Sequence, residues 1–198
     1  MKKIILTIIA AIIVTSCNNN TQEKEVADKS LEKKEWQKIT PKEITNNFVD
    51  ILSKGLLLSS GVEGDMNTMT IGWGGFGMFW KRPTLTIYVN ALRHTHKFID
   101  KYEYFTVCNF DDEYQDKIVY MGTHSGKDVD KVKGSGLTVK YTELGTPYYD
   151  EANLVIECKI IYKDKIDKEQ ALEDVKQMYV DSPYHSMIIG EIVNVIKK

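Results

Sequence analysis

An arginine and a hydroxyl group stand together where a helix is expected to begin. The run Arg93-His94-Thr95-His96 follows a strand-like segment and opens a helical pattern. A guanidinium, a hydroxyl and the free amides of a helix N-terminus together make a pocket suited to a phosphate. Only two of the 26 basic residues are arginines, and the use of one here fits bidentate phosphate binding. The alternative interpretation is a solvated helix cap with a surface arginine.

Three glycines, Gly72, Gly74 and Gly77, have the spacing of the G-x-G-x-x-G dinucleotide fingerprint. That fingerprint needs a helix beginning at the third glycine, because the helix N-terminus holds the pyrophosphate. Here Pro83 lies too near for a long helix, and a second strand pattern follows it. We therefore place the glycines in a strand, where they allow either a tight bend or the close approach of a flat ligand.

A second polar loop, Ser125 to Lys131, carries the two cations Lys127 and Lys131 and by itself fits a solvated helix–loop junction. His94 and His96 are two residues apart, but no further ligands follow at a spacing that zinc uses, so we predict no metal site. The chain also lacks a G-x-S-x-G motif, the usual sequence signature of a serine nucleophile in hydrolases.

Cys108 and Cys158 each lie in an apolar, strand-like segment. In an exported protein two such residues can form a disulfide. Two buried free thiols agree with the same pattern. The sequence leaves both alternatives open.

The composition indicates one globular domain and excludes several classes of protein. The 198 residues are 42% hydrophobic, which is enough for one core of ordinary size. An aromatic content of 10% with only 4 prolines excludes a disordered or collagen-like chain. The 26 basic and 28 acidic residues give a net charge of -2, so there is no electrostatic footprint for nucleic acid.

The first residues have the form of an export signal. Two lysines precede an apolar run over Ile4–Val14, which is too short to span a membrane as a helix. Ser16 and then Cys17 follow, and a small residue before a cysteine resembles the lipobox of bacterial lipoproteins. That resemblance implies a signal peptide over residues 1–16 and a lipid on Cys17. The alternative is an ordinary secreted protein with a stray cysteine.

The predicted organisation is a tether followed by one folded domain. Residues 17–39 are polar and charged and bury too little apolar surface to order themselves, so we predict a polar tether. Trp36 is the exception, because its large ring can dock on the domain. The folded domain is placed at residues 40–198.

The domain is predicted to be mainly β. Strands outnumber helices and do not alternate with them, which favours a mostly antiparallel β-barrel with peripheral helices over a doubly wound parallel sheet. A first helix is expected between a Thr40 cap and Gly55. Further helices are expected at 96–102, 113–121 and 168–178, and strands at 56–60, 67–74, 84–90, 105–110, 137–141, 153–162 and 186–195.

Several short blocks occur in a characteristic order over residues 56–195. They are Asn67-x-Met69-Thr70-x-Gly72-Trp73-Gly74, Lys81-Arg82-Pro83, Arg93-x-Thr95, Phe105-Thr106-Val107, Ser125-Gly126-Lys127-Asp128-x-Asp130-Lys131, Glu151-Ala152, Glu157-Cys158 and His185-x4-Gly190-Glu191-Ile192-Val193. In this order the blocks resemble the flavin reductase-like proteins of the flavoredoxin type. The resemblance implies an antiparallel, Greek-key FMN-binding split β-barrel that forms a homodimer, with the flavin near the subunit interface.

The resemblance also implies a set of site residues. A catalytic role near the reactive face of the flavin is implied for His185. Relatives often carry arginine where this chain has Lys127, and a lysine keeps the charge but loses the forked geometry. The residues implied to bind the cofactor are Asn67, Met69, Thr70, Ile71, Gly72, Trp73, Arg93, Thr95, His96, Ser125, Gly126, Lys127 and Lys131.

The leading hypothesis is an FMN-binding oxidoreductase that is lipid-anchored in the bacterial cell envelope and touches the membrane through its anchor only. A nicotinamide is the usual electron donor of the family, but no nicotinamide pool is expected in the envelope, so another reductant, such as a quinol-linked partner or a thiol, is an alternative. Two other hypotheses stay open. One is a non-catalytic envelope lipoprotein that binds FMN or another planar anionic ligand, and the other is a barrel oxidase related to pyridoxal-phosphate enzymes.

Overall fold

The computed structural model describes residues 35–198. The predicted signal peptide, the lipidation site Cys17 and most of the predicted tether therefore lie outside the described residues. The compact domain begins at Trp36. No helix in the described part of the chain is both long and apolar enough to cross a membrane.

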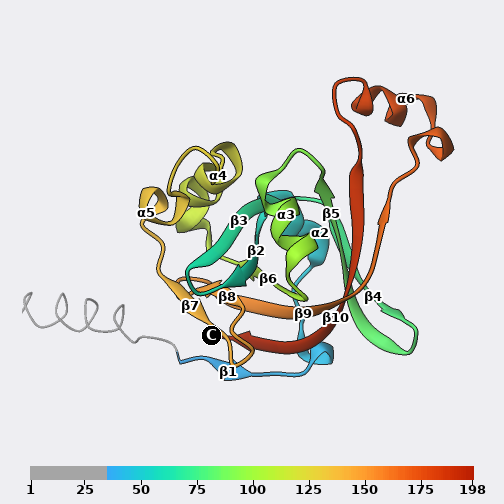
Figure 1. The fold of residues 1–198 in the computed structure, drawn as a ribbon. Coiled ribbons are helices and arrows are strands. Elements are labelled where there is room, and N and C mark those ends of the chain that lie inside the picture. The colour runs from blue at the N-terminus through green and yellow to red at the C-terminus, as the bar shows by residue number, and fades with distance from the viewer. Residues whose placement is uncertain (1–34) are drawn as a thin grey trace, which may run out of the picture. The chain divides into compact units, whose positions relative to one another are not determined.

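One antiparallel sheet forms the body of the domain (Figure 1), and it is mainly β as the sequence predicts. Its seven long strands follow the order β3-β2-β6-β9-β10-β5-β4, and the short β1 pairs with β10. Two further strands, β7 and β8, pair with each other. The strands are β1 (Gln37–Lys38), β2 (Leu56–Val62), β3 (Asp65–Ile71), β4 (Gly74–Phe79), β5 (Arg82–Asn90), β6 (Tyr104–Asn109), β7 (Val139–Tyr141), β8 (Pro147–Tyr149), β9 (Leu154–Lys165) and β10 (His185–Lys197).

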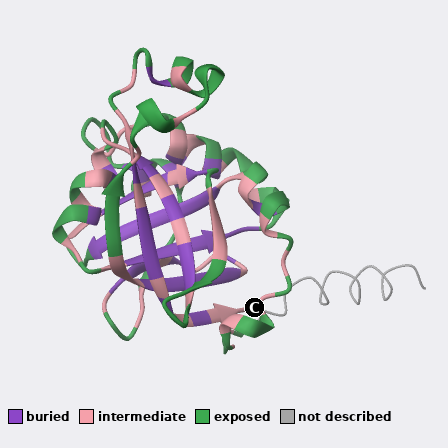
Figure 2. Ribbon diagram, turned by 90° about the vertical axis from the view of Figure 1, so that its right-hand side faces the viewer, coloured by how far each residue is buried: buried purple, intermediate pink, exposed green. Residues whose placement is uncertain are grey.

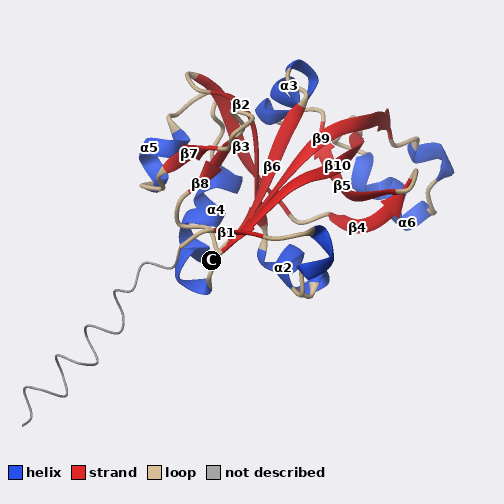
Figure 3. Cartoon of the chain, turned by 90° about the horizontal axis from the view of Figure 1, so that it is seen from below, coloured by secondary structure: helices blue, strands red, loops and turns tan. Residues whose placement is uncertain are grey.

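Short helices lie around the outside of the strands (Figure 3). They are α2 (Phe48–Lys54), α3 (His94–Lys101), α4 (Gln115–Thr123), α5 (Lys131–Ser135) and α6 (Glu173–Lys176). The ends of β9 and β10 extend beyond the body of the sheet, and the segment with α6 connects them there (Figure 1).

The first helix begins later than predicted. Thr40 starts only a single 3-10 turn, Pro41–Glu43, and the α-helix begins after Asn47. The Asn47 side chain accepts a hydrogen bond from the backbone N–H of Val49 at 3.1 Å, so asparagine provides the helix cap. The helix ends at Gly55, as the sequence predicts.

Two other elements also differ from the prediction. The single helix expected at 168–178 is broken into a 3-10 turn, the four-residue α6 and a second 3-10 turn. The strand expected at 67–74 ends at Ile71, and a separate strand, β4, starts at Gly74. Neither α5 nor β8 was expected, because each is too short to give a periodic signal.

The link Gly72–Trp73 lies at the open side of the barrel. It joins β3 and β4, which stand at opposite ends of the strand order, so the split of the barrel lies beside it. A Cβ atom on Gly74 would lie 2.5 Å from the Thr86 carbonyl oxygen of β5, so this glycine allows the two strands to approach. Gly74 and Gly77 both lie within β4, so the rejection of a dinucleotide fingerprint is confirmed.

Most of the buried, purple ribbon in Figure 2 lies on the strands. The buried residues form two apolar clusters. The larger fills the barrel with residues such as Leu85, Ile87 and Phe105, and the smaller lies beneath α4 around Tyr149. Cys108 and Cys158 are both buried and free, so the disulfide alternative is wrong. Burial raises the pKa of the Cys108 thiol to about 12.

Trp36 packs on the domain next to the sheet. Its ring meets the Tyr148 ring edge-on at 5.8 Å, and its Nε1 donates to Asp150 Oδ1 at 3.4 Å. The ammonium of Lys198 lies 4.4 Å from the centre of the indole. The chain that enters the domain is therefore held against β10 from Trp36 onward.

Candidate functional site

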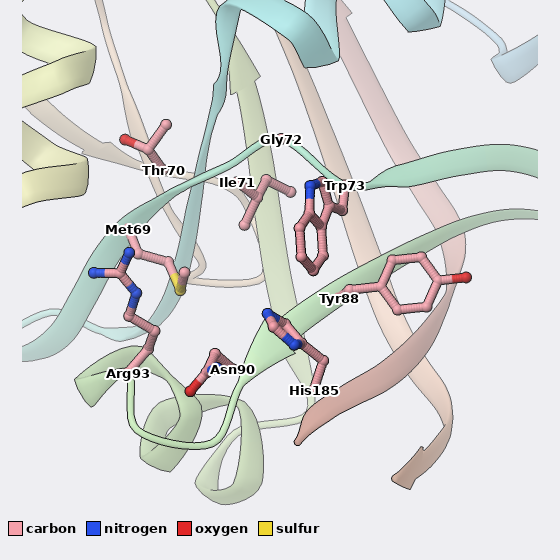
Figure 4. A pocket seen from close by; sticks show the side chains of 9 residues that line it. All are labelled: Met69, Thr70, Ile71, Gly72, Trp73, Tyr88, Asn90, Arg93 and His185. Atoms are coloured by element: carbon pink, nitrogen blue, oxygen red, sulfur yellow. The ribbon is translucent and has the colours of Figure 1, made fainter. Parts of the chain in front are cut away.

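A hollow of about 250 Å³ opens at the split of the barrel (Figure 4). Its walls come from β3, from the link between β3 and β4, from the end of β5 and from the first residue of β10. Trp73 and His185 lie together on one side of it, and Met69 and Arg93 lie on the other. The lining residues are Met69, Thr70, Ile71, Gly72, Trp73, Tyr88, Asn90, Arg93 and His185. We call this the ring hollow.

A second hollow of about 100 Å³ shares Met69 and Arg93 with the ring hollow, so the two adjoin. None of its lining residues is acidic, whereas Arg93 and Lys131 are basic. The lining residues are Asn67, Met69, Leu92, Arg93, His94, Thr95, His124, Ser125, Gly126 and Lys131. We call this the anion hollow. A third hollow of about 170 Å³ continues along β3 and shares Asn67, Gly126 and Lys131 with it.

The two cations of the anion hollow have no acidic partner. Lys131 is buried, and its ammonium donates to the Thr68 carbonyl oxygen at 2.6 Å. Arg93 donates to the Gly122 carbonyl oxygen at 3.1 Å. Within residues 35–198 neither side chain forms an ion pair. Burial and then the nearby Arg93 charge lower the pKa of Lys131 to about 8. Two close cations without a counter-charge can attract an anion.

The N-terminus of α3 faces the same hollow. Arg93 occupies the position before the first helical residue, and no side chain caps the first amides of the helix. Thr95 is buried and accepts a hydrogen bond from Asn67 Nδ2 at 2.8 Å, which leaves the Thr95 hydroxyl proton for another acceptor. The Nδ1 atom of His94 is buried without a partner. Each of these groups can donate to an anion.

A close contact fixes the loop that forms the opposite wall. A Cβ atom on Gly126 would lie 2.0 Å from Asn67 Oδ1, so only glycine lets the loop approach the Asn67 side chain this closely. The loop turns back at Ser125, whose carbonyl oxygen accepts from the backbone N–H groups of Asp128 and Val129 at 3.0 and 3.1 Å. Lys127, within this turn, is exposed and does not line the hollow.

His185 is held between two aromatic rings at the ring hollow. The Trp73 ring lies 4.7 Å from the imidazole, and the Tyr179 ring meets it edge-on at 5.7 Å. Burial and then the charge of Arg93 lower the pKa of His185, so the imidazole is neutral around neutral pH. Its Nδ1 atom is buried without a partner among the residues described. A neutral imidazole with a spare nitrogen can bind one more polar atom.

The structure brings together twelve of the predicted site residues. Only His96 and Lys127 lie elsewhere: His96 lines a different cavity beyond β10, and Lys127 is exposed. The residues that the ring hollow and the anion hollow collect are Asn67, Met69, Thr70, Ile71, Gly72, Trp73, Arg93, Thr95, Ser125, Gly126, Lys131 and His185. No cluster of metal-ligating side chains occurs in the described part of the chain.

Sequence reasoning missed five lining residues. Tyr88 and Asn90 alternate on β5 with the buried Ile87 and Val89, and this period of two was available in the sequence. The other three are the exposed Leu92 and two histidines, His94 and His124. His94 is adjacent to Arg93, but His124 comes close only through folding.

Comparisons with known proteins agree with this geometry. The model of the family "Flavin reductase like domain" matches residues 53–198. A model of the prokaryotic membrane lipoprotein lipid attachment site matches residues 1–18. No curated protein gives a significant match.

Three solved structures illustrate the fold. The flavoredoxin from Methanosarcina acetivorans is 26% identical with a TM-score of 0.59, and the match covers 73% of this chain and 68% of that one. The flavoredoxin of Desulfovibrio vulgaris (Miyazaki F) is 24% identical with a TM-score of 0.58, covering 73% and 69%. An FMN-binding protein from Thermus thermophilus is 19% identical with a TM-score of 0.57, covering 73% and 71%. The chain thus belongs to the flavin reductase-like domain family and carries a prokaryotic lipoprotein attachment site at its N-terminus.

Proposed function

We propose that this protein binds FMN and acts as a flavin reductase-like oxidoreductase of the bacterial cell envelope. The observation that carries the proposal is the continuity of the aromatic ring hollow with an anion hollow that contains two unpaired cations. A molecule with a planar ring at one end and a phosphate at the other matches this arrangement. FMN has that form, and an FMN-binding protein is among the similar structures.

Each hollow has a separate task in this proposal. Arg93, Lys131, Thr95 and the first amides of α3 hold the phosphate in the anion hollow. The backbone of β3 from Met69 onward borders the ring. Because β3 is an end strand of the sheet, its main-chain groups are available beside the hollow. FMN, when bound, supplies the hydride or electron transfer. His96 and Lys127 are left out of the proposed site.

His185 is proposed to contact the ring as a neutral hydrogen-bonding group. Trp73 and Tyr179 hold its imidazole in one orientation. Its lowered pKa keeps a positive charge off this edge of the hollow at neutral pH. The neutral imidazole can therefore donate or accept one hydrogen bond to the ring without adding a second positive charge beside Arg93.

The absorption spectrum of the purified protein tests the proposal. We expect flavin bands either as isolated or after soaking with FMN, and release of FMN on denaturation. Riboflavin has the same ring without the phosphate and serves as the matched ligand. A protein that stays colourless after FMN soaking would contradict the proposal.

A non-catalytic FMN carrier is the second candidate function. Lys127 favours it, since this exposed lysine does not line the anion hollow and cannot offer the forked geometry of an arginine. Turnover separates the candidates. Bound FMN that is not reduced by nicotinamides, dithiols or quinols supports the carrier, and reduction by one of them supports the oxidoreductase and identifies its donor.

The affinity for FMN is expected to fall as the pH rises through the pKa of Lys131, which is about 8. A bound phosphate dianion favours the charged form of the Lys131 ammonium. Above the pKa of Lys131 the side chain is neutral, so it must take up a proton when FMN binds, and this weakens the binding. The Kd should rise by up to about tenfold per pH unit above that point. Titrations between about pH 7 and pH 9 measure this slope, and Lys131→Met should flatten it. The same slope in the variant would remove Lys131 from the site.

The protein is proposed to be anchored through a lipid on Cys17, and Cys17→Ser should release it from membranes. The apolar run before Cys17 is too short to hold the chain in a bilayer by itself, so the acyl chains carry the anchoring. Membrane fractionation of the two forms, with FMN binding as a check on folding, measures the effect. A variant that stays with the membrane would refute acylation at Cys17.

A homodimer is part of the proposal. The hairpin between β4 and β5 exposes Met78, Phe79 and Trp80, and Trp73 at the ring hollow is half exposed. Trp80 and Lys81 form the two-residue turn at its tip, with the positive φ angles of 49° and 61° that such hairpin turns use. A second copy of the chain is the proposed partner of this hairpin. Light scattering of the domain in solution, with a molar mass of two chains expected, tests it.

A further inference from the structure

Three side chains outside the proposed flavin site form a chain of hydrogen bonds. The hydroxyl oxygen of Ser186 lies 2.8 Å from Nε2 of His96. The other ring nitrogen, Nδ1, lies 3.0 Å from Oδ2 of Asp100. A hydroxyl, an imidazole and a carboxylate in this order are the connectivity of an activated nucleophile, its base and the group that orients the base.

The fold separates this triad from the flavin site while using the same elements. Consecutive residues of a strand point to opposite faces, so His185 faces the ring hollow and Ser186 faces α3. His96 and Asp100 are four residues apart on α3, which places them on one face of the helix. The triad therefore results from the packing of α3 against β10 and has no sequence motif.

The partners of His96 fix its tautomer. Asp100 is about half exposed, and its second oxygen, Oδ1, forms an ion pair with the Lys163 ammonium at 3.3 Å. A carboxylate only accepts hydrogen bonds, and Nδ1 of His96 must therefore carry the proton. In the neutral imidazole, Nε2 is then the acceptor of the Ser186 hydroxyl proton. This is the tautomer that a general base needs.

The triad lines a cavity that can admit a small molecule. The cavity has a volume of about 310 Å³, and both Ser186 and His96 reach its wall. Lys165 also lines it, next to the Tyr184 ring at 4.8 Å, and forms no ion pair in the described domain. An ammonium at the wall can stabilise an oxyanion that forms above Ser186. Ser186 itself is only 8% exposed, so slender acyl groups are favoured.

We propose that Ser186 is an acylable nucleophile and that this cavity hydrolyses short-chain esters, independently of FMN. The Ser186 oxygen forms a bond to the acyl carbon while its proton moves to Nε2 of His96. The bond to the alkoxy oxygen then breaks, and the alcohol leaves with that proton. Water attacks the acyl-serine by the same steps and returns the carboxylic acid and the free serine, so no oxidant or reductant is needed.

Covalent labelling of the whole protein tests the proposal without any substitution. Diisopropyl fluorophosphate should phosphorylate Ser186, which peptide mass spectrometry detects, and p-nitrophenyl acetate should be cleaved faster than p-nitrophenyl butyrate. Adducts found only on lysines or on other serines would overturn the proposal. FMN binding is measured on the same samples, so failure of the flavin proposal and failure of this one are distinguishable.

Variants then test the roles within the triad. Ser186→Ala should abolish the labelling, and His96→Gln should lower its rate at least tenfold, with Asp100→Asn shifting its pH dependence. Ser53→Ala, an exposed serine on α2, is the matched control and should behave like the wild type. Labelling of Ser186 at an undiminished rate in His96→Gln would overturn the role of the histidine. Retention of FMN binding shows that α3 is still in place in each variant.

Discussion

Arg93→Ala is expected to weaken FMN binding by roughly 1.5–3 kcal/mol, a rise of about 10- to 150-fold in Kd. The guanidinium lines both hollows and has no acidic partner in the described domain, so its charge is free for the phosphate. Its removal also leaves Lys131 as the single cation of the anion hollow. The double variant with Lys131→Met should lose more affinity than either single variant, because the remaining cation can no longer compensate.

Fluorescence titration with FMN measures this loss, and two controls sharpen it. Arg82→Ala removes the other arginine, whose guanidinium pairs with Glu191 at 2.5 Å far from the hollows, and should leave the affinity unchanged. Riboflavin, which lacks the phosphate, should bind the wild type and Arg93→Ala equally. Equal losses for FMN and riboflavin would show that Arg93 acts on the ring or on folding, and an unchanged FMN affinity would remove it from the site.

The strands could be predicted from the sequence because each carries its own signal. Alternation and β-branched residues mark β5, β9 and β10, whose predicted ranges agree closely with the structure. The break between β3 and β4 carries no such signal, since the apolar and aromatic pattern continues through Gly72 and Trp73. The chain changes partner strands there, and a partner strand is a non-local property.

Part of the phosphate side could be predicted, because Arg93 and Thr95 are neighbours at the start of one helix, whereas Asn67 and the Ser125–Lys131 loop reach the anion hollow from distant parts of the chain. The family resemblance also implied His96, but Arg93 precedes the helix with an extended backbone, φ -71° and ψ 133°, so the two side chains do not follow one helical register. Tyr88, Asn90 and His185 meet only because β5 pairs with β10, where Asn90 lies opposite His185. Without the strand pairing, Tyr88 and Asn90 could not be linked to the site.

Gly190→Ala is expected to destabilise the domain by about 1–3 kcal/mol, the usual cost of overpacking a core. A Cβ atom at this position would lie 2.6 Å from Cβ of Cys158 and 2.8 Å from the ring of Phe105. Both neighbours are completely buried, and the Cys158 contact is an atom next to the backbone that cannot turn away. A β-bulge falls between Ile189 and Gly190, so the added methyl group would also strain the pairing of β9 with β10.

Thermal and denaturant unfolding measure the effect, which corresponds to a fall of roughly 2–12 °C in Tm. Gly75→Ala is the matched control, because no atom lies within 4 Å of its added Cβ and alanine is preferred to glycine inside a strand. Phe105→Leu should cost less stability in the Gly190→Ala background than in the wild type, since a smaller side chain relieves the clash. Additive losses would place the strain of Gly190→Ala elsewhere, and an unchanged Tm would mean that the core around Phe105 rearranges without cost.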